Sequence, residues 1–294
     1  RIDQLAEGVL VAHVPLTDQT VRSRRDRCLD EHEEPKMMLK DKVAVIYGAG
    51  GAIGGAVARA FAREGAELYL TGRLRAPVEA VAGDTGSAEA AEVDALDERA
   101  IDEHLRSVVD KAGRVDISFN AVGIPNAGIL GVPLAELDAE QFSLPITSYT
   151  RSYFLTARLA ARRMVANRSG VIMTVTTLQS RTGFATAGGF GPAMAAKEAL
   201  TRELSAELAP QGVRVVGLRP QGIPGTDSLR EAFEPRAKAS GTLEQLHEVA
   251  ASRTHTRRLS TLAELANVAV FMASDQASGM TGTTVNLSMG GLDD

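Results

Sequence analysis

Short apolar runs alternate with alanine-rich segments of helical period from Lys42 to the end of the chain. The runs are apolar throughout instead of alternating with polar residues, which indicates strands buried on both faces. Strands are predicted at Val43–Tyr47, Glu67–Thr71, Val115–Ala121, Val171–Thr177, Val213–Leu218 and Thr283–Leu287. Helices are predicted within 56–65 and over Glu98–Ala112, Ala139–Ala166, Ala193–Leu208 and Leu262–Met272.

This alternation predicts an α/β fold with a Rossmann-like, doubly wound parallel sheet, built as three α/β/α layers in a single domain. Glu98–Ala112 carries Ile101, Leu105 and Val108 on one face, as a helix packed on a sheet requires. Pro145 should start, kink or interrupt the long helix in which it lies. The polar, helix-patterned segment 227–257 is predicted to form a lid.

The first 36 residues differ from the rest of the chain. Arg22–Lys36 is a dense run of mixed charges, and regular patterning starts only after Met37. We interpret residues 1–36 as a flexible or added extension and 37–294 as the domain. The alternative is an arm that docks on a neighbouring subunit.

Composition narrows the function. The 294 residues are 44% hydrophobic with a formal net charge of −5, which disfavours a nucleic-acid-binding face. Cys28 is the single cysteine and cannot form an internal disulfide, which fits a reducing, cytoplasmic location. No apolar run reaches the ~18 residues of a membrane span. The histidines show no metal-ligand spacing, so no metal is expected.

A glycine-rich turn, Tyr47–Gly55, connects the first strand to the first helix. Glycines there allow a tight turn and a close approach of the backbone to a pyrophosphate, which the helix N-terminus then binds. Ile53 stands where the third glycine of G-x-G-x-x-G belongs, and a plain connection is the alternative interpretation.

Gly48-x-x-x-Ala52-x-Gly54 resembles the T-G-x-x-x-G-x-G turn of the short-chain dehydrogenase/reductase family. Further motifs agree in order: Asp94-Ala95, Asn120-Ala121-Val122-Gly123, Lys197, the segment from Pro220 to Thr226, and the stretch from Arg258 to Gly291. The resemblance covers about Leu39 to Gly291 and implies a nicotinamide dinucleotide cofactor. It implies cofactor contacts from Gly48, Gly50, Gly51, Ala52, Ile53, Gly54, Asp94, Ala95, Asn120, Ala121, Gly123, Lys197, Pro220, Ile223 and Thr226.

Arg73 follows the second strand, where an NAD site needs an acid for the ribose 2′-hydroxyl. An arginine binds a phosphate instead, so NADP(H) is predicted over NAD(H), which stays possible. The alternative is that Arg73 and Arg75 are solvated surface charges.

The family's catalytic tyrosine is missing. The family places it four residues before the lysine, or seven in the enoyl-reductase branch, and these positions hold Ala193 and Phe190. The four tyrosines are Tyr47, Tyr69, Tyr149 and Tyr153, and no local shift brings one to either position.

Other side chains can supply the missing chemistry. Thr177 occupies the position where the resemblance implies a substrate-orienting serine, and Ser180 is the second choice. Tyr149 aligns with the family's active-site asparagine on the long helix, so a phenol can enter the site from there. Lys197 beside it would favour its ionised form. The alternative places Tyr149 in packing against the lid or a subunit interface.

The first functional hypothesis is an NADP(H)-dependent oxidoreductase acting on a small carbonyl, hydroxyl or enone substrate through an atypical proton donor. The second is a catalytically degenerate nucleotide-binding sensor or partner subunit, and the third a redox-neutral lyase or isomerase. The family resemblance implies a homodimer or homotetramer formed through the helices at 157–166 and 193–208.

Overall fold

The computed structural model describes residues 37–86, 88–125 and 129–293, and Met37–Asp294 forms one compact unit. The extension predicted over residues 1–36 lies outside the described residues. The strands are β1 (Val43–Tyr47), β2 (Glu67–Gly72), β3 (Glu89–Glu92), β4 (Ile117–Asn120), β5 (Gly170–Val175), β6 (Val213–Pro220) and β7 (Thr283–Leu287). The helices are α2 (Ala52–Arg63), α3 (Arg75–Thr85), α4 (Glu98–Ala112), α5 (Ala139–Met164), α6 (Phe190–Leu208), α7 (Asp227–Ser240), α8 (Leu243–Ser252) and α9 (Leu262–Ala273).

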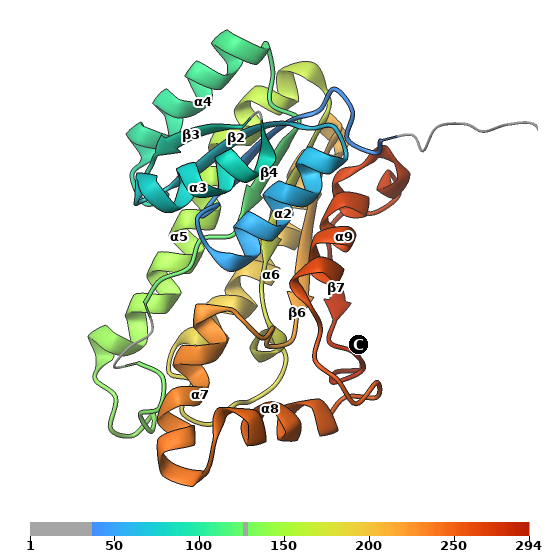
Figure 1. The fold of residues 1–294 in the computed structure, drawn as a ribbon. Coiled ribbons are helices and arrows are strands. Elements are labelled where there is room, and N and C mark those ends of the chain that lie inside the picture. Colours follow the sequence, from blue (N-terminus) through green and yellow to red (C-terminus); the bar gives the residue numbers. More distant parts are fainter. Residues whose placement is uncertain (1–36, 87, 126–128, 294) are drawn as a thin grey trace, which may run out of the picture. The chain divides into compact units, whose positions relative to one another are not determined.

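The seven strands form one parallel sheet in the order β3-β2-β1-β4-β5-β6-β7, with helices on both faces (Figure 1). Alternate residues of β1 explain the layers. Ala44 and Ile46 pack into a core with α2 and α9, whereas Val45 and Tyr47 point to the opposite core with α4 and α5. This confirms the Rossmann-like, three-layer α/β fold predicted from the apolar strands.

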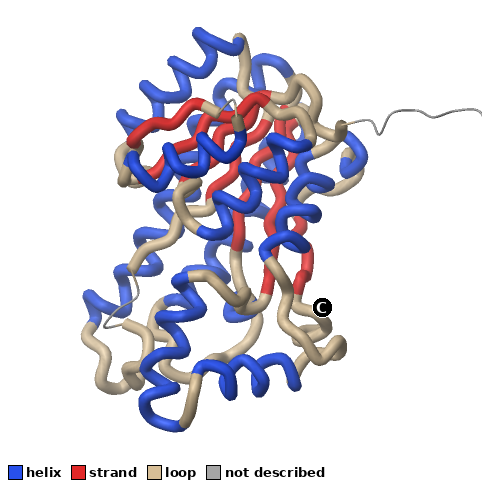
Figure 2. Tube along the Cα trace, viewed as in Figure 1, coloured by secondary structure: helices blue, strands red, loops and turns tan. Residues whose placement is uncertain are grey.

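The chain leaves β1 toward β2 and β3 and later returns to β4 on the other side of β1. Helices therefore diverge beyond the carboxyl ends of β1 and β4, which leaves a crevice at this switch point. Helices α7 and α8 lie beyond the carboxyl ends of β6 and β7 (Figure 2). The segment predicted as a lid is thus two helices beside the crevice.

Some elements differ from the predictions. No prediction covered α3 or β3, because β3 is a four-residue edge strand, EAAE, without β-branched residues. Pro145 lies inside α5 without ending it, and the helix stops at Met164, two residues before the predicted end. Among the described residues, no helix is long and apolar enough to cross a membrane.

Candidate active site

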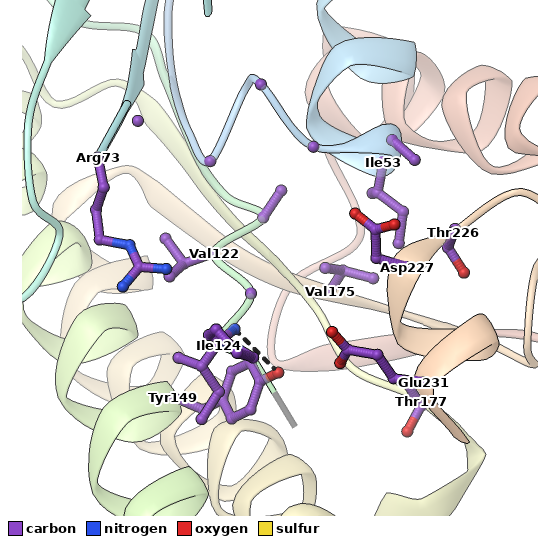
Figure 3. A pocket seen from close by; sticks show the side chains of 18 of the residues that line it. Ile53, Arg73, Val122, Ile124, Tyr149, Val175, Thr177, Thr226, Asp227 and Glu231 are labelled. Atoms are coloured by element: carbon purple, nitrogen blue, oxygen red, sulfur yellow. Dashed lines mark hydrogen bonds between the residues drawn. The ribbon is translucent and has the colours of Figure 1, made fainter. Parts of the chain in front are cut away.

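A cavity of about 420 Å³ opens at the carboxyl ends of the strands. Its lining comes from the glycine turn, the end of β2, the loop after β4, α5, the end of β5, α6 and the start of α7 (Figure 3). The predicted site residues that line it are Gly48, Gly50, Gly51, Ala52, Ile53, Arg73, Ala121, Gly123, Tyr149, Thr177, Lys197 and Thr226. One cavity thus brings together residues from most of the chain.

The glycine turn is shaped by close backbone contacts. Gly48 has a positive φ of 77°, and a Cβ there would lie 2.7 Å from the carbonyl oxygen of Ala121. A Cβ on Gly54 would lie 2.3 Å from the carbonyl oxygen of Gly48. Gly51 caps α2 without a side-chain hydrogen bond, which leaves the helix N-terminus available to an anion. This part of the cavity fits a dinucleotide pyrophosphate.

Two arginines follow β2, and the structure distinguishes them. Arg73 is exposed, lines the cavity and extends toward Val122 (Figure 3). Its guanidinium has no hydrogen bond or ion pair among the described residues. Arg75 instead forms an ion pair with Glu79, with Nε 2.6 Å from Oε1. Of these two arginines, Arg73 lines the cavity and Arg75 does not.

Lys197 lies at the other end of the cavity. Its side chain is 1% exposed, and Nζ donates a 2.8 Å hydrogen bond to the carbonyl oxygen of Val175. Burial lowers the pKa of Lys197 to about 7. Nζ lies 5.8 Å from the centre of the Tyr149 ring and 5.7 Å from that of Tyr153.

The two tyrosines beside Lys197 differ in what they reach. Tyr149 lines the cavity, and its hydroxyl accepts a 3.4 Å hydrogen bond from the backbone N–H of Ile124 (Figure 3). The Tyr153 hydroxyl is buried away from the cavity and lies 3.0 Å from Thr201 Oγ1. Burial raises the pKa of Tyr153. Tyr149 alone among the described tyrosines presents a phenol to the cavity.

The two positions at which the resemblance implies a catalytic tyrosine, 193 and 190, hold side chains that only pack. Ala193 is 0% exposed, and Phe190 packs edge-on against Tyr149 with ring centres 5.6 Å apart. Neither residue offers a proton.

Thr177 and Ser180 are also distinguished by their contacts. Thr177 Oγ1 is buried without a hydrogen-bond partner in the described part of the chain, and the residue lines the cavity. Ser180 Oγ lies 2.6 Å from Glu198 Oε1 and outside the cavity lining. An unpaired buried hydroxyl is costly unless a ligand completes it, which points to Thr177.

A buried ion pair next to the segment after β5, which carries Thr177 and Ser180, was not predicted. Arg219 Nε donates to Glu198 Oε1 over 2.8 Å, with the two side chains 4% and 3% exposed. The same carboxylate oxygen accepts from Thr176 Oγ1 over 2.9 Å. The pair therefore ties α6 to β6 and to both ends of the segment that carries Thr177. The sequence feature that could have predicted this pair is Arg219 near the end of the apolar strand VRVVGLRP, since an arginine buried in a strand needs an acidic partner.

Several predicted cofactor residues lie outside the cavity lining: Gly54, Asp94, Ala95, Asn120, Pro220 and Ile223. Asp94 accepts a hydrogen bond from the backbone of Leu96, and Ile223 is part of the core. Asn120 Nδ2 donates to Thr156 Oγ1 over 3.1 Å and joins β4 to α5. Asn120 Oδ1 is buried without a partner among the described residues.

A second cavity of about 300 Å³ adjoins the first, and both are lined by Thr177 and Phe190. Its other walls come from the loop after β5 and from α7 and α8. Nothing in the strand and helix pattern located this cavity, because it lies between segments that are far apart in the sequence.

Comparisons with known proteins agree with this geometry. The family described as "Enoyl-(Acyl carrier protein) reductase" matches residues 48–291. The chain is 30% identical to a peroxisomal 2,4-dienoyl-CoA reductase of Pongo abelii over 253 residues, 84% of this chain and 82% of that protein. It is 27% identical to the 7alpha-hydroxysteroid dehydrogenase of Escherichia coli over 267 residues, 87% and 96% of the two chains. A crystal structure of NAD+-bound xylitol dehydrogenase superposes with a TM-score of 0.79 over 85% of this chain and 98% of that one; at 24% identity this shows the shared fold.

Proposed function

The chain belongs to the short-chain dehydrogenase/reductase family and is an oxidoreductase, and we propose that it uses NADP(H) and takes its proton from Tyr149. The observation that carries the proposal is the single cavity with the glycine turn and Arg73 at one end and Lys197, Tyr149 and Thr177 at the other. Such a cavity holds a dinucleotide with its reactive ring beside acid/base groups.

Cofactor preference rests on Arg73. A 2′-phosphate beside β2 would meet a guanidinium that has no partner among the described residues, and no acid stands at the position where NAD needs one. We expect Arg73→Ala to weaken NADPH binding about tenfold and to leave NADH binding unchanged. Arg75→Ala is the matched control, because Arg75 is paired with Glu79. Dissociation constants for both cofactors decide the assignment, and an unchanged preference in Arg73→Ala contradicts it.

Each residue of the reaction end has a role in this mechanism. The chemistry that a reduced nicotinamide would supply when bound in this cavity is a hydride. Thr177 Oγ1 donates a hydrogen bond to the substrate oxygen, and Tyr149 gives its phenolic proton to that oxygen as the hydride adds to carbon. Lys197 in its protonated form, with Nζ 5.8 Å from the centre of the Tyr149 ring, stabilises the negative charge left on the phenolate. Phe190 keeps water away from the phenol on one side.

The substrate class follows from the site and the relatives together. The names of the matched family and of the dienoyl-CoA reductase describe reduction of conjugated double bonds, and that of the steroid dehydrogenase describes chemistry at a hydroxyl group. We infer a small enone or carbonyl substrate for this protein.

The direct test is NADPH oxidation with a panel of ketones, quinones and conjugated enones. We expect turnover of at least one class. Tight NADPH binding without turnover of any class would contradict the proposal and favour a nucleotide-binding sensor or partner subunit.

We also propose a homodimer or homotetramer formed through α5 and α6. Phe154 on α5 is a large apolar side chain that stays 40% exposed, with Arg158 5.1 Å above its ring. Sedimentation of Phe154→Glu should show a smaller species than that of the unmodified protein. A cytoplasmic location stays a prediction.

A further inference from the structure

The second cavity is placed to hold the substrate. Thr177 and Phe190 line it as well as the cofactor cavity, so a molecule bound there reaches the reaction end without crossing the pyrophosphate region. The inference that follows rests on the proposed function, because it takes the reaction end as the place of chemistry.

The walls of the second cavity are mainly apolar. Leu178 and Phe184 contribute from the loop after β5, and Leu229 and Phe233 from α7. Leu229 and Phe233 are each only 8% exposed although α7 is a polar helix, so their side chains turn inward. This lining selects a molecule with an apolar body.

One charge interrupts that lining. Arg253 is the only charged residue among the described residues that line the second cavity, and no carboxylate lines it. Its side chain has no hydrogen bond or ion pair with the described residues. Its neighbours are engaged elsewhere: Arg257 bonds the carbonyl oxygen of Ser252, and Arg258 pairs with Glu264. Arg253 is exposed, so its charge stays hydrated until a ligand occupies the cavity. An arginine among the residues that line an otherwise apolar cavity fits an anion supplied by that ligand.

We propose that the substrate is a partly apolar carbonyl or enone compound with a carboxylate at its far end. The carboxylate binds Arg253, the apolar body lies between α7 and the loop after β5, and the reacting group lies at Thr177. A guanidinium and a carboxylate match as a planar, two-bond pair, which fixes the orientation of the substrate as well as its affinity.

The test uses two probes, a straight-chain conjugated enone with a terminal carboxylate and its methyl ester. We compare kcat/KM with NADPH for the unmodified protein, Arg253→Ala and Arg253→Glu. Arg257→Ala is the matched control, since it removes the same charge four residues away and outside the cavity lining. The unmodified protein and Arg257→Ala should prefer the acid about tenfold. Arg253→Ala should lose this preference through KM alone, and Arg253→Glu should prefer the ester.

Equal use of acid and ester by the unmodified protein, or a preference that survives Arg253→Ala, would overturn the inference while leaving the reductase assignment intact. If neither probe is reduced, calorimetric binding of both to the NADP⁺-loaded protein decides instead. Tighter binding of the acid that depends on Arg253 supports the inference even where hydride transfer fails. Equal binding of the two probes overturns it.

Discussion

The two ends of the cofactor cavity are built by different means. At the nucleotide end the backbone makes the site, because Gly48 and Gly54 approach other backbone atoms so closely that a Cβ has no room. At the reaction end buried polar groups make it, namely Lys197, the Thr177 hydroxyl and the Glu198–Arg219 pair. A site formed by the backbone requires glycines at fixed positions in one segment. A site formed by side chains requires only that a suitable group reach the cavity, whichever helix carries it. This difference explains how a tyrosine can be absent from α6 while a phenol from α5 faces the cavity.

The largest effect is expected at the reaction end, from breaking the Glu198–Arg219 pair. Glu198→Ala removes the carboxylate that pairs with the buried guanidinium of Arg219, which should cost about 3–5 kcal/mol in the free energy of unfolding. Replacing both residues by methionine should recover most of that loss, because no charge is then buried. Urea denaturation measures both variants, with Glu79→Ala at an exposed pair as the control. A Glu198→Ala variant as stable as that control would show that the pair does not hold the loop.

A smaller effect is expected at the nucleotide end. In Gly54→Ala the new Cβ would lie 2.3 Å from the Gly48 carbonyl oxygen, so the turn must move away from α2. We expect NADPH affinity to fall at least about tenfold, because the displaced turn loses backbone hydrogen bonds to the phosphates. Gly83→Ala is the control, since a Cβ there meets nothing within 4 Å. Unchanged affinity in a folded Gly54→Ala variant would mean that the backbone does not shape this end.

The third prediction concerns pH. Burial lowers the Lys197 pKa from 10.5 to about 7, so between these values the unfolded chain binds a proton that the folded apoprotein does not. Stability should therefore rise with pH across this window, by about 1 kcal/mol between pH 7 and 8. Lys197→Met should remove that rise. If the free energy of unfolding rises equally with pH in Lys197→Met and in the unmodified protein, the rise comes from another titrating group.

The sequence predicted the nucleotide end better than the reaction end, for a physical reason. Strand, glycine turn and helix are consecutive in the chain, so Gly48, Gly51 and the following helix could be placed from local patterns alone. Arg73 was found in the same way, because it directly follows a strand. The sequence did not show that Glu79 forms an ion pair with Arg75 and leaves Arg73 unpaired among the described residues; the structure showed this.

The reaction end depends on contacts between distant segments. The Thr177 hydroxyl is unpaired among the described residues while Ser180 is held by Glu198, and spacing alone could not separate these two candidates. The second cavity was missed because α7 and α8 meet the loop after β5 only in the folded chain. Tyr149 was selected by alignment to the family, and its approach to Lys197 emerges from the packing of α5 on α6.

The relocated proton donor is the central claim, and one matched pair of variants tests it most directly. Tyr149 and Tyr153 flank Lys197 at nearly equal distances, 5.8 and 5.7 Å from ring centre to Nζ, but only Tyr149 lines the cavity. Each variant is measured in a single turnover with bound NADPH and an enone that the unmodified protein reduces. We predict that Tyr149→Phe slows the reaction by about 10²–10⁴-fold with unchanged NADPH affinity, while Tyr153→Phe retains the rate of the unmodified protein. Equal rates in the two variants would contradict the assignment of Tyr149 as the proton donor.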